Sequence, residues 1–211
     1  MNDEERILRA VHCESPGVEV VELRRLDPFI LVELADDRTK LVQPLKGFEA
    51  NELAHRRAGF ELLLVYDRPP SPLPMSCVAL FDDGKAYLLN DKDQLARFYH
   101  QAASAIPPFE LACLLVMFQS SSPDQLVTSL DALDALDLET PVTSLPGFTP
   151  LRVVGAVLEF WSYHVGLEGR DSLGQVDFTR WRVTGLDGDL QWDATYVGSI
   201  RSNKYDPRKP A

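Results

Sequence analysis

Strand-type sequence dominates both ends of the chain, apart from a short N-terminal helical pattern, whereas helical spacing of apolar residues dominates its middle. Near the N-terminus, Ile7, Leu8 and Val11 form an apolar stripe that predicts a helix over residues 3–13. The stretches VEVVELRRL, PFILVELA and KLVQPL follow, and their β-branched residues predict strands. The segment SCVALFDDGKAYLLN has an apolar run on each side of Asp83-Gly84, which is typical of a hairpin.

A central block, about residues 91–137, is expected to be helical. Asp91 and Gln94 have the spacing of a capping box at the start of its first helix. Residues 109–118 are apolar on every side, so periodicity leaves a buried helix and a buried strand as alternatives. Three residues predict the start of a further helix, which we expect to extend through residue 138: Ser122 as the N-cap, Pro123 at the first helical position and Gln125, which completes a capping box.

The C-terminal part is expected to contain only strands, over residues 151–165, 176–184 and 190–200. The whole pattern predicts an α+β fold with antiparallel strands at both ends of the chain and a C-terminal β-meander. We expect residues 1–211 to form a single domain. The Pro- and Thr-rich residues 139–150 are the candidate internal boundary. They would separate three parts: an α+β part at 1–138, the meander at 151–201 and a frayed tail at 202–211.

The last two strands can be aligned on a two-residue turn at Asp187-Gly188, which places Arg182 opposite Asp193. One face of this hairpin then carries apolar side chains, namely Trp181, Val183, Trp192 and Tyr196. The other face carries polar ones, namely Arg180, Arg182 and Asp193. Because this register separates apolar from polar residues, we expect one buried and one solvated face rather than a surface that binds a ligand with Arg and Trp.

The strand expected at 151–165 places Glu159 on the same face as Trp161 and Tyr163, and His164 on the other face. A buried carboxylate either pairs with an arginine or, in a cleft, serves as an acid or base, so both roles stay open for Glu159. The clustering of tryptophans nearby suggests an aromatic pocket for a small molecule. Its candidate binding residues are Trp161, Tyr163, Trp181, Trp192 and Tyr196.

Charge is unevenly distributed along the chain, whose net charge is −11. Residues 1–150 hold 24 acidic and 13 basic residues, whereas residues 151–211 hold eight of each. No Lys or Arg occurs at residues 98–151, where six acidic residues do. Such a surface repels nucleic acid and anionic membranes, despite a local group of bases at Arg180, Arg182, Arg201 and Lys204. A macromolecule that meets residues 98–151 is therefore expected to be a basic protein.

Local motifs offer little catalytic chemistry. The chain lacks the phosphate-binding loop, the nucleophile elbow and the HExxH motif. Glu52 and His55 share one face of a predicted helix at 49–58, where ion pairing with neighbours is the simpler interpretation than a metal site. The three cysteines, Cys13, Cys77 and Cys113, have no metal-binding spacing, and we expect reduced thiols in a cytoplasmic protein.

These observations favour a non-catalytic binding or protein-interaction module, of the inhibitor, immunity or adaptor type, over an enzyme. The alternative is a small-molecule-binding protein or an enzyme that uses the aromatic pocket and Glu159. We expect neither a metal nor a cofactor, and no membrane-spanning segment, since the longest apolar run, Leu111 to Phe118, is far shorter than the roughly 20 residues needed.

Overall fold

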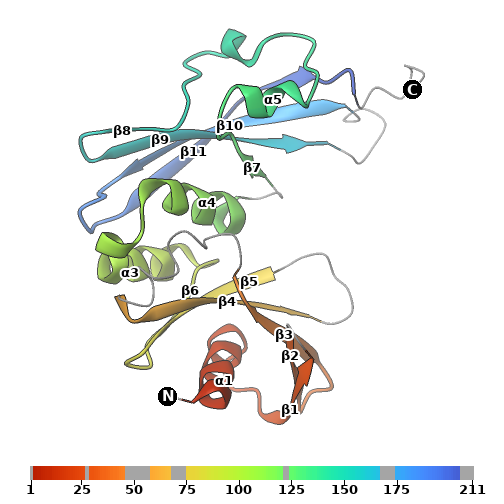
Figure 1. The fold of residues 1–211 in the computed structure, drawn as a ribbon, viewed down its shortest axis with the longest axis vertical. Helices are drawn as coiled ribbons and strands as arrows, with labels where there is room; N and C mark the ends of the chain where they lie inside the picture. Colours follow the sequence, from red (N-terminus) through yellow and green to blue (C-terminus); the bar gives the residue numbers. More distant parts are fainter. Residues whose placement is uncertain are drawn as a thin grey trace. The chain divides into compact units, whose positions relative to one another are not determined.

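The computed structural model describes residues 2–26, 29–45, 58–67, 75–120, 124–166 and 174–204. The chain divides into two compact units, Met1–Ile106 and Pro107–Ala211, each with its own antiparallel sheet (Figure 1). Both units combine helices and strands, so the predicted α+β class is confirmed. The candidate boundary at 139–150 lies inside the second unit, and the number of independently folding domains stays a prediction.

The first sheet is a six-stranded antiparallel meander in which each strand pairs with the next one along the chain. Its strands are β1 (Val20–Leu26), β2 (Phe29–Leu34), β3 (Thr39–Pro44), β4 (Phe60–Asp67), β5 (Met75–Phe81) and β6 (Ala86–Leu88). The hairpin predicted about Asp83-Gly84 is confirmed, because β5 and β6 pair with Leu80 opposite Ala86. The predicted helix at 49–58, including Glu52 and His55, lies outside the described residues except for its last residue.

Two helices cover opposite faces of this sheet (Figure 1). α1 (Asp3–Glu14) begins after Asn2, whose side-chain oxygen accepts a hydrogen bond from the Glu5 amide at 2.8 Å. The apolar stripe of α1 packs on one face of the sheet in a cluster that includes Ile7, Ala10, Val11, Val42 and Leu63. On the other face, α3 (Lys92–Ala102) places the ring of Phe98 edge-on to Phe60, with 5.2 Å between ring centroids.

The start of α3 forms half of the predicted capping box. The carboxylate of Asp91 accepts a hydrogen bond from the Gln94 amide at 2.9 Å. The side chain of Gln94 instead accepts a hydrogen bond from the amide of Leu88, at 2.9 Å. The side chain of Gln94 therefore connects the helix to β6 instead of completing the capping box. The spacing of Asp91 and Gln94 alone does not predict this contact. A short 3₁₀ helix, η2 (Ala103–Ala105), follows α3.

The second sheet has the order β11-β10-β9-β7, and β8 also pairs with β9. Its strands are β7 (Gln125–Leu126), β8 (Arg152–Val154), β9 (Val157–Val165), β10 (Gln175–Thr184) and β11 (Gln191–Arg201). The C-terminal antiparallel meander is thus confirmed. The single strand expected at 151–165 is wrong, because β8 folds back onto β9. Gly155 makes this reversal with a φ of +61°, a conformation that other residues adopt only with strain.

Residues 109–118 form a helix rather than a strand, within α4 (Pro108–Gln119). Pro108 stands in its first turn, where a missing amide hydrogen costs nothing. α4 contacts β7 and β9. It lies on the opposite side of the second sheet from the short helix α5 (Asp131–Asp134) (Figure 1).

The long helix expected from Ser122 to residue 138 is wrong, since only α5 and the two-residue strand β7 form in its described part. β7 pairs with β9, and the side chain of Gln125 accepts a hydrogen bond from the hydroxyl of Tyr163 at 2.6 Å. The residue expected to complete the helix cap is therefore engaged by the sheet. Ser122 and Pro123 lie outside the described residues.

The predicted register of the β10–β11 hairpin is confirmed, with Arg182 opposite Asp193 and Val183 opposite Trp192. The two-residue turn is wrong, because β10 ends at Thr184 and β11 begins at Gln191. Burial follows the prediction in β10, where Trp181 and Val183 are buried, but not in the middle of β11, where Tyr196 is 62 % exposed. β11 is the edge strand of the sheet, and its register with β10 shifts between Phe178 and Thr179. The side of β11 that carries Tyr196 is therefore less buried than the same side of β10.

Residues 202–204, the start of the tail expected to fray, lie against the second unit. Ser202 is fully buried and its hydroxyl donates to the carbonyl oxygen of Leu136. Residues 205–211 lie outside the described residues. In the described ranges, no helix has the length and apolar character needed to cross a membrane.

Candidate functional site

Glu159, the candidate acid or base, is paired with an arginine. β8 and β9 place Arg152 directly opposite Glu159, and two guanidinium nitrogens of Arg152 donate to the Glu159 Oε2 atom at 2.9 and 2.6 Å. These hydrogen bonds hold the pKa of Glu159 below its ordinary value, with smaller contributions from the charges of Arg152, Arg182 and Arg180. A carboxylate of lowered pKa stays ionised at neutral pH, which suits an ion pair better than a general acid.

The aromatic candidates lie on opposite faces of the second sheet. β9 and β10 pair Trp161 with Arg180 and Trp181 with Phe160, so Trp161 and Trp181 point in opposite directions. Both indoles are 1 % exposed. The face of Trp161 also carries Tyr163, whereas the face of Trp181 carries Trp192 and Tyr196. One pocket on one face cannot include all five residues, and ligand binding by either group stays a prediction.

The face of Trp161 is covered by α5 and by the segment that joins α5 to β8. Trp161 lies against Phe148, with 5.1 Å between ring centroids, and shares a cluster with Leu133, Leu136 and Val142. Its indole Nε1 atom is buried without a hydrogen-bond partner in the structure. Apolar packing therefore fixes this tryptophan, at the cost of one unsatisfied donor.

The face of Trp181 contains two linked hydrogen bonds, one buried and one partly buried, that the sequence does not reveal. The indole of Trp181 donates to the hydroxyl of Ser162 at 2.9 Å, and that hydroxyl donates to the carboxylate of Asp124 at 2.8 Å. Phe160 stacks on Trp181 with 5.6 Å between ring centroids and 9° between ring planes. These bonds link β10, β9 and the residue that precedes β7. Ser162 accepts from Trp181, and Asp124 accepts from Ser162.

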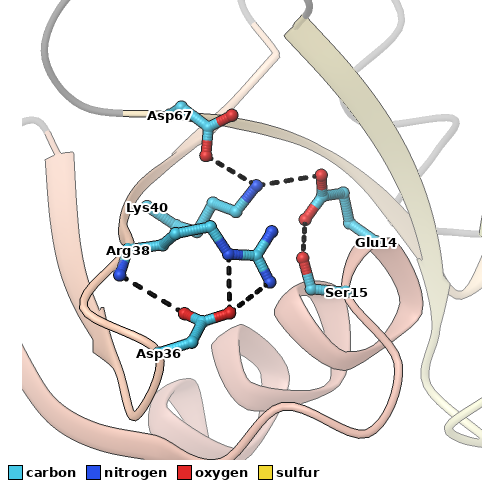
Figure 2. Close-up of polar contacts among 6 residues, drawn as sticks. All are labelled: Glu14, Ser15, Asp36, Arg38, Lys40 and Asp67. Carbon is cyan, nitrogen blue, oxygen red and sulfur yellow. Dashed lines mark hydrogen bonds and ion pairs between the residues drawn. The ribbon is translucent and has the colours of Figure 1, made fainter.

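The first unit holds a buried lysine, shown in Figure 2, that sequence analysis also missed. Lys40 on β3 is 2 % exposed, and its ammonium lies 3.0 Å from an oxygen of Glu14 and 2.8 Å from an oxygen of Asp67. The hydroxyl of Ser15 donates to the second oxygen of Glu14 at 2.5 Å. The ammonium of Lys40 is therefore enclosed by its own ion pairs and is not accessible to a substrate.

A second partly buried ion pair joins α1 to β4. Arg6 binds both oxygens of Glu61 at 2.6 Å, and the two side chains are 31 % and 29 % exposed. Burial raises the pKa of Glu61, although the charge of Arg6 opposes that shift. This bidentate contact forms one side of an open pocket at the start of α1.

Thiols and metal ligands provide no further chemistry in the described ranges. Burial raises the pKa of Cys77 well above its ordinary value and that of Cys113 to about 11, so neither is an activated thiolate at neutral pH. In the same residues, no group of three or more metal-binding side chains converges. Comparison with known protein families, with curated proteins and with solved structures finds no match to this chain.

Proposed function

We propose that the protein is a non-catalytic interaction module, of the inhibitor, immunity or adaptor type, that binds a basic protein. The observation that carries this proposal is a group of four exposed carboxylates close together in the second unit: Asp131, Asp134, Asp137 and Glu139. We call these four residues the acidic group. A concentrated negative surface attracts a positively charged partner and accelerates its association.

The acidic group is the exposed part of the base-free span at residues 98–151. The span holds two other acids, and neither is free at the surface. Glu110 is 4 % exposed on α4, and Asp124 accepts the hydrogen bond from Ser162. The surface charge of this span is therefore concentrated between residues 131 and 139.

The segment that carries the acidic group is anchored although little of it is helical. Leu133 and Leu136 are buried in the core of the second unit. The Glu139 amide donates to the Arg201 carbonyl oxygen at 2.8 Å, beside β11. Charges on an anchored segment lose little conformational freedom on binding, which supports a preformed docking surface.

Two neighbours adjust the character of this surface. The ammonium of Lys204 donates to the Ala135 carbonyl oxygen at 3.2 Å and offsets one of the four negative charges. Leu130, which directly precedes α5, is 44 % exposed and offers an apolar contact beside the carboxylates. The expected partner surface is therefore basic with at least one apolar side chain.

The test compares three full-length proteins as baits in lysate of the source organism, at low and at physiological salt. The first is the wild type, and the second neutralises the acidic group by Asp131→Asn, Asp134→Asn, Asp137→Asn and Glu139→Gln. The third neutralises four other exposed acids by Glu19→Gln, Asp93→Asn, Asp187→Asn and Asp189→Asn. Captured proteins are identified by quantitative mass spectrometry, and the affinity of a purified partner is then measured.

The proposal expects a basic protein that the wild type and the control variant capture equally. Neutralising the acidic group should weaken its binding about 10- to 100-fold, because exposed ion pairs contribute roughly 0.2–1 kcal/mol each. Recovery of no protein at either salt concentration contradicts the proposal. So does a partner whose affinity falls equally in both variants, since net charge alone would then explain the binding.

A further inference from the structure

The pocket at the start of α1 has the size of a ligand site. Its volume is about 390 Å³, within the roughly 300–1,000 Å³ typical of small-molecule sites. It lies between the N-terminal turn of α1 and one end of the first sheet, and residues of β1, β2, β3 and β4 line it. A smaller pocket of about 220 Å³ adjoins it and shares Asp3, Ile7, Arg25 and Ile30 with it.

The floor of this pocket is apolar. Ile7 on α1, Val42 on β3 and Leu63 on β4 are 7 %, 0 % and 3 % exposed and belong to one core cluster. Phe29 and Ile30 of β2 also line the pocket. A ligand that fills the pocket must therefore present an apolar group to this floor.

The rim of the pocket carries two ion pairs of unequal strength. Arg6 and Glu61 form the bidentate, partly buried pair described above. Asp3 and Arg25 form a single contact of 2.9 Å, and their side chains are 71 % and 76 % exposed. Exposed pairs of this kind contribute little to stability, so a ligand can separate Asp3 from Arg25 at small cost.

Charge balance then selects the ligand. An anion alone would gain Arg25 but lie beside the carboxylate of Asp3, and a cation alone would lie beside the guanidinium of Arg25. A ligand with one group of each sign satisfies both side chains and leaves the Arg6–Glu61 pair intact. We propose that this pocket binds a zwitterion with apolar side chains, an α-amino acid or a dipeptide, whose ammonium pairs with Asp3 and whose carboxylate pairs with Arg25.

This ligand site goes beyond the proposed interaction with a basic protein and uses none of the acidic group, so the two proposals fail independently. The test is a titration of the full chain, labelled at its Ile, Leu and Val methyl groups, with L-leucyl-L-leucine and with L-leucine. Binding should shift the methyl resonances of Ile7, Ile30, Val42 and Leu63. The tighter of the two probes then identifies a dipeptide or a free amino acid as the preferred form.

Blocked probes and variants separate charge recognition from apolar contact. N-acetylation or C-amidation of the probe should each weaken binding about tenfold, the effect expected when a charge-assisted hydrogen bond is lost. Asp3→Asn should weaken binding of the free dipeptide by a similar factor. This variant should then bind the free and the N-acetylated dipeptide with the same dissociation constant. Arg25→Gln should likewise bind the free dipeptide and the C-amidated dipeptide with the same dissociation constant.

The Asp36–Arg38 pair provides matched controls, because it is an exposed ion pair of the first unit at 2.7 Å that lines neither pocket. Asp36→Asn and Arg38→Gln should leave the dissociation constant unchanged. The proposal is overturned if neither probe shifts the four methyl resonances at millimolar concentration, or if the doubly blocked dipeptide binds as tightly as the free one. Equal weakening by the control variants would overturn it as well, and the wild-type titration stands even where a variant fails to fold.

Discussion

Both units bury a polar nitrogen against their sheets, but the first unit buries an ammonium and the second an indole N–H. Lys40 meets two carboxylates, one from the end of α1 and one from the end of β4 (Figure 2). Trp181 meets a single hydroxyl, which in turn meets the carboxylate of Asp124. A buried charge requires countercharges and therefore joins distant segments, whereas a neutral donor requires only one acceptor on the neighbouring strand.

The difference implies that the two units depend on these groups to different degrees. Removal of Lys40 leaves two like charges facing each other, one of them on Glu14, whose side chain is only 17 % exposed. Removal of the Ser162 hydroxyl leaves the Trp181 N–H without its acceptor but creates no repulsion. Substitutions at the two places can therefore be ordered by their expected cost.

The largest effect is expected for Lys40→Met. We expect the free energy of unfolding of the first unit to fall by about 3 kcal/mol or more, because one member of a buried ion pair is removed. Urea unfolding followed by circular dichroism measures this loss. Lys85→Met is the matched control, since Lys85 pairs with Asp83 at 2.9 Å at an exposed position.

The triple variant Lys40→Met, Glu14→Gln and Asp67→Asn sharpens this comparison. It removes the charges together, and such replacements are often close to neutral. We therefore expect it to be more stable than Lys40→Met alone. A Lys40→Met protein as stable as the control would show that the ion pairs of Lys40 with Glu14 and Asp67 do not stabilise the first unit.

How far the sequence predicts this architecture depends on the range of the interactions. The β10–β11 register follows from local alternation, because the hairpin connects adjacent strands and a slip by one residue would mix apolar with polar side chains. The helix expected from Ser122 has as strong a local signal, and it is wrong over its described residues. Tyr163, 38 residues away, binds Gln125, and local pattern cannot register a partner at that distance.

The same limit applies to the polar sites. Pairing of Glu159 with an arginine is one of the two roles left open, and Arg152 lies within reach because Gly155 reverses the chain. Lys40 is not predictable, since its burial depends on Glu14, which is 26 residues away, and on Asp67, which β4 places opposite it. The α1 pocket is likewise assembled from five separate segments.

A smaller loss is expected for Ser162→Ala, which removes the hydroxyl shared by the two linked hydrogen bonds in the second unit. We expect about 1–3 kcal/mol, the cost of leaving the buried Trp181 N–H unsatisfied. The emission maximum of tryptophan fluorescence should also shift, since the Trp181 N–H loses its acceptor. Ser199→Ala is the control, because Ser199 is an exposed serine that binds Tyr196 and Asp177. Equal stability of the two variants would contradict a structural role for these hydrogen bonds.

Trp181→Phe and Trp161→Phe then isolate one hydrogen bond. Both indoles are 1 % exposed on the same sheet, but only the Trp181 N–H has a partner. Each substitution opens a similar cavity, so the difference between them reports the hydrogen bond. We expect Trp181→Phe to cost about 1 kcal/mol more than Trp161→Phe in denaturant unfolding. A larger cost for Trp161→Phe would indicate that its indole N–H is in fact satisfied.

The smallest effects concern the two glutamates that pair with arginines, Glu61 in the first unit and Glu159 in the second. Their shortest contacts with arginine are equal, at 2.6 Å, but burial raises the pKa of Glu61 whereas hydrogen bonds from Arg152 lower that of Glu159. Geometry alone therefore does not set the direction of the shift. The degree of burial decides whether desolvation or the arginine dominates.

Linkage converts these directions into opposite pH dependences of unfolding. The stabilisation from Glu159 is present above its unfolded pKa, near 4.5, and is lost as the pH falls through its lowered folded pKa. The contribution of Glu61 is present below about 4.5 and is lost as the pH rises through its raised folded pKa. In urea unfolding between roughly pH 3 and 6, the advantage of wild type over Glu159→Gln should shrink on acidification. Its advantage over Glu61→Gln should grow. Parallel pH profiles for the two variants would show that burial does not shift the pKa values of Glu61 and Glu159 in opposite directions. The Arg6–Glu61 side of the α1 pocket would then not be desolvated.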